Sequence, residues 1–132
     1  MRMSVRLNLP READSVPAVR RLLTCTLTML NIDRQSRTDL EIALTEACAN
    51  VIRHAAGTDH FEVCLEVDEE RCAIDVIDYG DGFDPVLAGT LPPRADSERG
   101  RGLFLIKALS ENVRMHSEPR RGSLIHFEKS FR

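Results

Sequence analysis

Alternation of hydrophobic and polar residues marks the strands of this chain. Apolar residues occupy every second position in three segments, a period typical of a strand with one buried face and one solvated face. Two further segments flank the turn sequence PRRG, which predicts a closing hairpin. The five predicted strands are 3–9, 61–67, 72–78, 112–118 and 123–131.

A hydrophobic period of three to four residues marks the helices. Asp14 or Ser15 is positioned to cap the first helix. Ser36 and Asp39 resemble a capping box at the start of the second helix, which stops at Gly57. The predicted helices are 14–32, about 36–56 and 102–110.

The order of these elements predicts the fold class. Two helices separate the first strand from the next two, and a long polar loop at 79–99 precedes the last helix. Because the strands have one apolar face, the helices should cover one side of the sheet only. We expect a single α+β domain over residues 1–132, a two-layer α/β sandwich with a mixed, mostly antiparallel sheet.

Composition narrows the class of protein. The net charge of −3 over 132 residues does not suggest a nucleic-acid partner. The four cysteines have no CxxC spacing, which disfavours a zinc site, and no apolar run approaches the length of a membrane span. Nothing resembles a signal peptide. We therefore expect a cytoplasmic protein with reduced thiols and no membrane association.

Three polar side chains recur every four residues inside the second predicted helix. Glu46, Asn50 and His54 stack on one face, with Glu46 and Asn50 on the shoulder of an apolar arc and His54 closer to its middle. A shoulder position is where a helix borders a cleft. The plainer interpretation is an ordinary amphipathic boundary, with Glu46 and Asn50 half solvated and His54 packed and hydrogen-bonded.

The third predicted strand ends with an aspartate on its apolar face. Asp78 is in phase with Ile74 and Val76, and a buried carboxylate needs a partner. The sequence YGDGF follows, where Gly80 and Gly82 permit positive φ or close approach to the backbone. The alternative is that Asp78 only caps a tight turn at the end of the strand.

Glycines also open the third predicted helix. Gly100 and Gly102 lie in ERGRGLFLIKAL, and the free N–H groups of a helix N-terminus favour phosphate. Ser123 is in phase with Phe127, so its hydroxyl also faces inward. It could share a water with Asp78 or simply begin the last strand.

The stretches EACANVIRH, DYGDGF and GRGLFLI, in this order, resemble the N, G1 and G2 boxes of the GHKL ATPase superfamily. The short chain and the variants EACANVIRHA and GRGLFLIKAL are most similar to the bacterial anti-sigma-factor serine/threonine kinases. This resemblance covers nearly the whole chain and implies the Bergerat fold, with ATP between helices and sheet under a lid loop at about 84–99. EPRRG departs from the pattern, since relatives often carry small residues in that turn.

The resemblance implies a role for each matching residue. Glu46 would be the general base, Asn50 would coordinate Mg²⁺, and Asp78 would accept the amino group of adenine. His54 would give structural or phosphate-side support. The other implied nucleotide contacts are Gly80, Gly82, Gly100, Arg101, Gly102, Leu103 and Ser123. The arginines that could reach the γ-phosphate are Arg94, Arg99 and Arg101.

The implied function is an ATP-binding anti-sigma factor that sequesters a sigma factor and phosphorylates an anti-sigma antagonist on serine. Arg20 and Arg21 are candidates for the partner surface, and relatives suggest a homodimer. One alternative is a nucleotide-binding partner-switch module without kinase turnover. Another is a detached histidine-kinase-type catalytic domain, although that domain normally follows a phosphoacceptor helix pair and this chain starts at the first strand.

Overall fold

A computed structural model describes residues 1–54, 57–80, 98–118 and 122–131. Every strand and helix expected from the hydrophobic pattern is present, with bounds that differ by a few residues. In chain order the elements are β1 (Met3–Pro10), α1 (Ser15–Met29), α2 (Arg34–His54), β2 (His60–Val67), β3 (Arg71–Asp78), α4 (Glu98–Leu109), β4 (Glu111–Glu118) and β5 (Gly122–Ser130). None of the described helices is long and apolar enough to cross a membrane.

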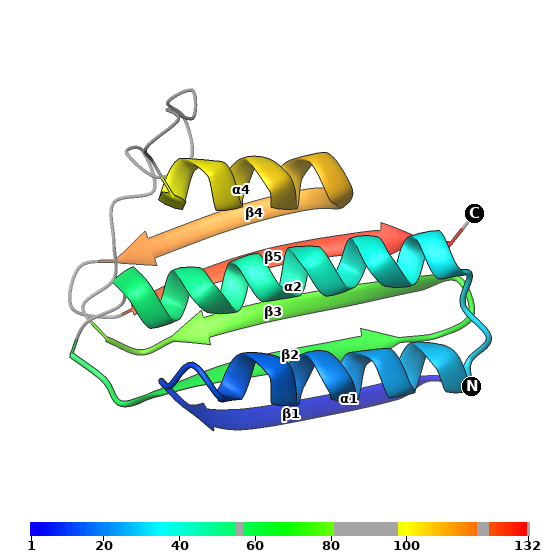
Figure 1. Ribbon diagram of the computed structural model, residues 1–132, viewed down its shortest axis with the longest axis horizontal. Coiled ribbons are helices and arrows are strands. Elements are labelled where there is room, and N and C mark those ends of the chain that lie inside the picture. The colour runs from blue at the N-terminus through cyan, green and yellow to red at the C-terminus, as the bar shows by residue number, and fades with distance from the viewer. Residues whose placement is uncertain (55–56, 81–97, 119–121, 132) are drawn as a thin grey trace.

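The strands form one sheet in the order β1-β2-β3-β5-β4 (Figure 1). All four neighbouring pairs of described strands are antiparallel. The three described helices lie on one face of this sheet (Figure 1), which confirms the expected α+β sandwich. The parallel component expected of a mixed sheet does not occur among the described strands.

The core lies between the sheet and the helices. The residues predicted to face inward are buried in β2, β3 and β5 and half-buried in β1, and Phe61 and Phe127 are the largest fully buried side chains of the core. Cys48 and Cys72 also pack there, and burial raises the pKa of each thiol to about 12. These two thiols therefore stay protonated and act as small apolar side chains.

The capping box predicted for α2 is wrong. The helix begins at Arg34, and the carboxylate of Asp33 accepts the N–H of Ser36 at 2.9 Å. This hydrogen bond lowers the pKa of Asp33. Asp39 lies inside the helix and accepts hydrogen bonds from Gln35 and Lys129 instead. The sequence SRTD matched the pattern, but the cap lies one turn earlier.

Two other helix starts also differ from expectation. Asp14 makes no side-chain cap at α1, and the hydroxyl of Ser15 donates to the carbonyl of Pro10 at 2.6 Å. Helix α4 begins at Glu98 rather than at Gly102. Because of this earlier start, Gly102 lies within the helix, beyond the first turn in which N–H groups are free.

The helix-free face of the sheet carries charged side chains that pair with one another. Arg71 contacts Glu128 at 2.6 Å, and His126 lies between Asp75 at 2.6 Å and Glu128 at 2.7 Å. Burial lowers the pKa of His126, but its hydrogen bonds to Glu128 and Asp75 outweigh burial, so the pKa is raised. The same contact lowers the pKa of Glu128.

Candidate functional site

The row of polar residues on α2 lies at the edge of the core. Asn50 is only 5% exposed, and its Oδ1 accepts no hydrogen bond from any residue that the structure describes. Glu46, one turn earlier, is half-buried, and half-buried His54 is the last residue of the helix. Asn50 is thus more deeply buried than a shoulder position predicts. A buried amide oxygen that accepts no hydrogen bond destabilises a protein unless a ligand interacts with it. Mg²⁺ prefers oxygen ligands, so a bound Mg²⁺ could supply that interaction.

Helix α4 explains why Asn50 is buried. A Cβ added at Gly102 would lie 3.0 Å from Oε2 of Glu46 and 3.5 Å from Oδ1 of Asn50. The backbone of α4 therefore approaches α2 as closely as a glycine allows. The structure brings together the EACAN and GRG stretches, which are far apart in the sequence.

Asp78 ends β3 and is almost completely buried, at 1% exposed. Its Oδ1 accepts the N–H of Gly80 at 2.8 Å, and its Oδ2 accepts the hydroxyl of Ser123 at 3.2 Å. The carboxylate of Asp78 is therefore buried, as its phase in the strand predicted, and it also caps the turn. A carboxylate has about four acceptor positions, so capacity remains for a donor group on a ligand.

Gly122 is a residue of this site that the sequence argument did not single out. Its φ is +109°, and a Cβ there would lie 1.9 Å from the carbonyl oxygen of Asp78. Only glycine fits where β5 begins beside the end of β3, and this contact sets Ser123 opposite Asp78 in the register of the two strands. The available signal was a glycine directly after the two arginines of the turn.

The other predicted site residues lie in α4 or outside the described part of the chain. Leu103 is 2% exposed and packs in the core, while Gly100 and Arg101 lie in the first turn of α4. The side chain of Arg101 lies outside the described part of the chain, as do Gly82 and the lid from 84 to 97. The expectations for these residues stay predictions.

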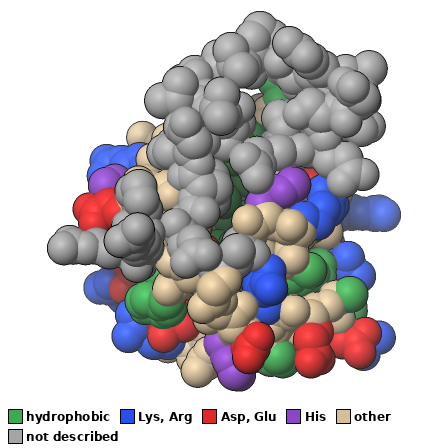
Figure 2. Space-filling model, turned by 90° about the vertical axis from the view of Figure 1, so that its left-hand side faces the viewer, with side chains coloured by type: hydrophobic (Ala, Val, Ile, Leu, Met, Phe, Trp, Pro, Cys, Tyr) green, Lys and Arg blue, Asp and Glu red, His purple; other side chains and the backbone are tan. Residues whose placement is uncertain are grey.

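The parts of the site lie at one end of the molecule. Helix α2 and strand β3 end there, and α4 begins there (Figure 1). Viewed from that end, charged, histidine and hydrophobic side chains all reach the surface (Figure 2). One end of the sandwich gathers a buried carboxylate, the N-terminal part of a helix, and an amide oxygen that accepts no hydrogen bond from the described residues.

A hollow of about 250 Å³ lies beside Glu46. It is lined by Arg20 of α1 together with Glu41, Ile42, Thr45 and Glu46 of α2. Ile42 is 38% exposed, so the hollow offers apolar as well as charged surface. Glu46 thus borders both the contact with α4 and an opening between α1 and α2.

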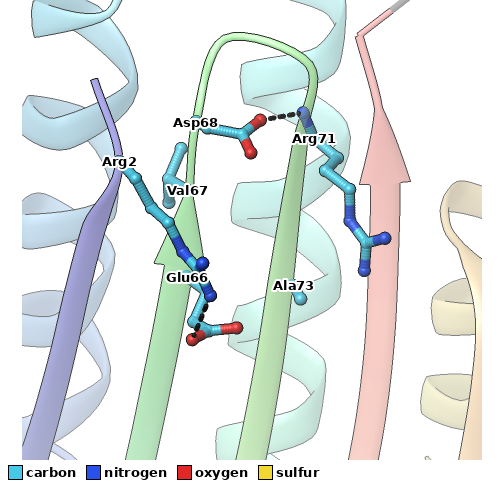
Figure 3. A pocket seen from close by; sticks show the side chains of 6 residues that line it. All are labelled: Arg2, Glu66, Val67, Asp68, Arg71 and Ala73. Carbon is cyan, nitrogen blue, oxygen red and sulfur yellow. Dashed lines mark hydrogen bonds and ion pairs between the residues drawn. The ribbon is translucent and has the colours of Figure 1, made fainter.

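A second hollow, of about 290 Å³, lies away from these residues. It is on the helix-free face, at the turn between β2 and β3, where Arg2 points to Glu66 and the backbone of Arg71 bonds to Asp68 (Figure 3). Asp78 is at the other end of β3. Arg2 pairs with Glu66, and the guanidinium of Arg71 pairs with Glu128 outside the lining, so this hollow adds nothing to the site around Glu46.

The family model of the histidine kinase-like ATPase domain matches residues 9–127. The chain therefore belongs to the histidine kinase-like ATPase domain family, as its three sequence boxes indicate. The matched region includes every described residue of the site.

Relatives within this family are serine-protein kinases called RsbW. The protein of Bacillus subtilis (strain 168) is 30% identical over 124 residues, which cover 86% of this chain and 78% of that protein. The protein of Staphylococcus epidermidis is 28% identical over 126 residues, with 86% and 79% covered. These names support the expectation of protein serine kinase activity.

Solved structures agree with the fold. The RsbU and RsbW domains of Rv1364c from Mycobacterium tuberculosis match with a TM-score of 0.75 at 18% identity, covering 98% of this chain and 33% of that chain. This chain therefore spans about one third of that protein. The catalytic domain of the histidine kinase ThkA matches with a TM-score of 0.56 at 15% identity, covering 98% and 97%.

Proposed function

We propose that this protein binds ATP and transfers the γ-phosphoryl group to a serine hydroxyl of a partner protein. The observation that carries the proposal is the close approach of Gly102 to Glu46 and Asn50. It gathers a carboxylate, a buried amide oxygen and the N-terminal part of α4 in one place. The relatives named serine-protein kinases support the same activity.

The nucleotide would be held at its two ends. The remaining acceptor capacity of Asp78 suits the amino group of adenine, and Ser123 and Gly80 fix the orientation of that carboxylate. The N-terminal part of α4 suits phosphate. Oδ1 of Asn50 would hold Mg²⁺, which neutralises phosphate charge when it is bound.

The base would be Glu46. Its carboxylate accepts the proton of the serine hydroxyl, the serine oxygen bonds to the γ-phosphorus, and the bond from that phosphorus to the leaving ADP oxygen breaks. The hollow beside Glu46, which Arg20 also lines, is where we place the serine-bearing segment of the partner. Positioning of the two reactants supplies much of the rate enhancement in this class of reaction.

The wider proposal concerns the partners. We infer that the substrate is an anti-sigma antagonist and that the protein also sequesters a sigma factor, in the cytoplasm where sigma factors act. A homodimer belongs to the same proposal, and sedimentation velocity of the purified protein tests it. Capture of a sigma factor without phosphoryl transfer would favour a partner-switch module that uses nucleotide only as a structural ligand.

The first experiment is a calorimetric titration with ATP, with and without Mg²⁺. We expect Asp78→Asn to abolish binding, because an amide N–H₂ would replace an acceptor. We expect Asn50→Ala to bind ATP without dependence on Mg²⁺. Absence of ATP binding by folded wild-type protein would refute the proposal.

The second experiment measures phosphoryl transfer from labelled ATP to the antagonist. Glu46→Gln keeps the shape of the side chain but removes its basicity, and we expect the rate to fall by about 10²- to 10⁴-fold. Glu70→Gln is the matched control, since Glu70 is exposed in the turn between β2 and β3, at the other end of the sheet. Transfer by Glu46→Gln at the rate of this control would exclude Glu46 as the base.

A further inference from the structure

Lys129, near the end of β5, joins three elements through one ammonium group. Its Nζ donates to Oδ2 of Asp39 on α2 at 2.8 Å and to the carbonyl oxygen of Leu109 on α4 at 3.1 Å. Gln35 donates to the other oxygen of Asp39 at 2.8 Å. The side chains of Lys129 and Asp39 are only 20% and 11% exposed, so solvent screens this ion pair weakly.

The contact with Leu109 satisfies the C-terminal end of α4. The last carbonyl groups of a helix have no partner within the helix, and a cation there also interacts favourably with the helix dipole. Beside it, Ser130 of β5 donates its N–H to Glu111, the first residue of β4, at 3.1 Å. The end of α4 is therefore bound to the end of β5.

The opposite part of α4 belongs to the candidate site. Gly102, which approaches Glu46 and Asn50, precedes Leu109 by seven residues, or about 10 Å along a helix. A helix of this length moves as a unit, so the position of Leu109 sets the position of Gly102. Because the backbone at Gly102 lies so close to Glu46 and Asn50, there is room for only small displacements of α4 toward α2.

We propose that Lys129 is a positioning residue for the phosphate end of the site. By holding the carbonyl group of Leu109 against the end of β5, it fixes where α4 lies beside α2, and thereby the surroundings of Glu46 and Asn50. This inference rests on the proposed function, because it assigns the consequence to nucleotide binding. Lys129 itself touches neither Glu46 nor Asn50 in the described contacts.

Three single variants and one double variant separate this role from simple stabilisation by an ion pair. Lys129→Met removes both hydrogen bonds, and Lys129→Arg keeps a cation that can donate to both acceptors. Asp39→Asn removes the ion pair but leaves Lys129 able to donate to Leu109. The double variant of Asp39→Asn with Lys129→Met leaves no unpaired buried charge, and it replaces Lys129→Met if that protein does not fold.

The experiment combines ATP titration in the presence of Mg²⁺ with amide hydrogen exchange of residues 102–109 in the nucleotide-free protein. We expect Lys129→Met to weaken ATP binding by roughly 2- to 30-fold and to speed exchange in α4 relative to α1. Lys129→Arg should restore both, and Asp39→Asn should bind ATP as the wild type does even where its Tm is lowered.

Wild-type affinity and wild-type exchange in Lys129→Met, or in the double variant, would overturn the inference. An equal loss of affinity in Asp39→Asn would overturn it as well, since the ion pair alone would then explain the effect. Failure of the wild-type protein to bind ATP would refute the proposed function, while the exchange rates would still decide whether Lys129 holds α4.

Discussion

Replacement of Gly102 by alanine separates stability from activity. The added Cβ would lie 3.0 Å from Oε2 of Glu46, whereas an ordinary contact begins at 3.4 Å, so one of the two groups must move by about 0.4 Å (3.4 − 3.0). The nearest atom is the end of a flexible side chain, so Glu46 should move rather than the backbone. The variant therefore displaces the proposed base without removing it.

The two effects on stability nearly cancel. Alanine within a helix is favoured over glycine by about 1 kcal/mol, and an off-rotamer glutamate costs about 0.5–1.5 kcal/mol. We expect the free energy of unfolding to change by less than about 1 kcal/mol in either direction. Because catalysis depends steeply on position, we expect phosphoryl transfer to fall on the order of tenfold.

Urea denaturation and transfer kinetics on the same preparation measure both quantities. Ala108→Gly is the control, since Ala108 is exposed on the same helix; it should lose about 1 kcal/mol of stability and keep its transfer rate. Wild-type transfer by Gly102→Ala would refute the placement of Glu46. A stability loss above about 2 kcal/mol would mean that the helix backbone moves instead.

Three further predictions test the fold. Gly122→Ala should lower the free energy of unfolding by at least about 2 kcal/mol, because of its φ of +109° and the collision with Asp78; a loss below half of this in urea denaturation would contradict the geometry. Ile106→Ala should cost about 2–5 kcal/mol, whereas Phe104→Ala, at a position 56% exposed, should hardly move the urea midpoint; the reverse order would mean that α4 is turned differently. Because the fold raises the pKa of His126, the stabilisation of the fold by its protonated ring is complete below the pKa that His126 has in the unfolded chain. It is lost as pH rises through the pKa that His126 has in the folded protein. Over roughly pH 5 to 8 the wild-type Tm should therefore fall more steeply than that of His126→Gln, and parallel curves would remove His126 as the cause.

Sequence patterns predicted the parts of this fold that depend on local burial. A two-residue period fixes which face of a strand is apolar, so the inward side of β3, including Asp78, could be assigned without a structure. The spacing of Glu46 and Asn50 likewise placed them on one side of α2. The outcome at Asp78 shows that a polar residue in an apolar phase is informative about a buried site.

Features that depend on packing between distant segments could not be predicted in this way. The burial of Asn50 comes from α4, more than 40 residues away, and the helical period of α2 contains no information about that contact. The sequence around Asp39 matched a capping box, but its carboxylate accepts a hydrogen bond from Lys129, which lies 90 residues later in the chain. Helix starts were misplaced because several residues near each start can serve as caps.

The place of β5 in the sheet has a consequence for how the protein is made. This strand comes last along the chain, yet it lies between β3 and β4, and Ser123 follows its partner Asp78 by 45 residues. While the protein is being synthesised, β1 to β3 can pair before β5 emerges from the ribosome, but β3 then has an open edge and Asp78 lacks one of its donors. Under the proposed function, nucleotide bound at this carboxylate would therefore stabilise the finished sheet and not the nascent chain.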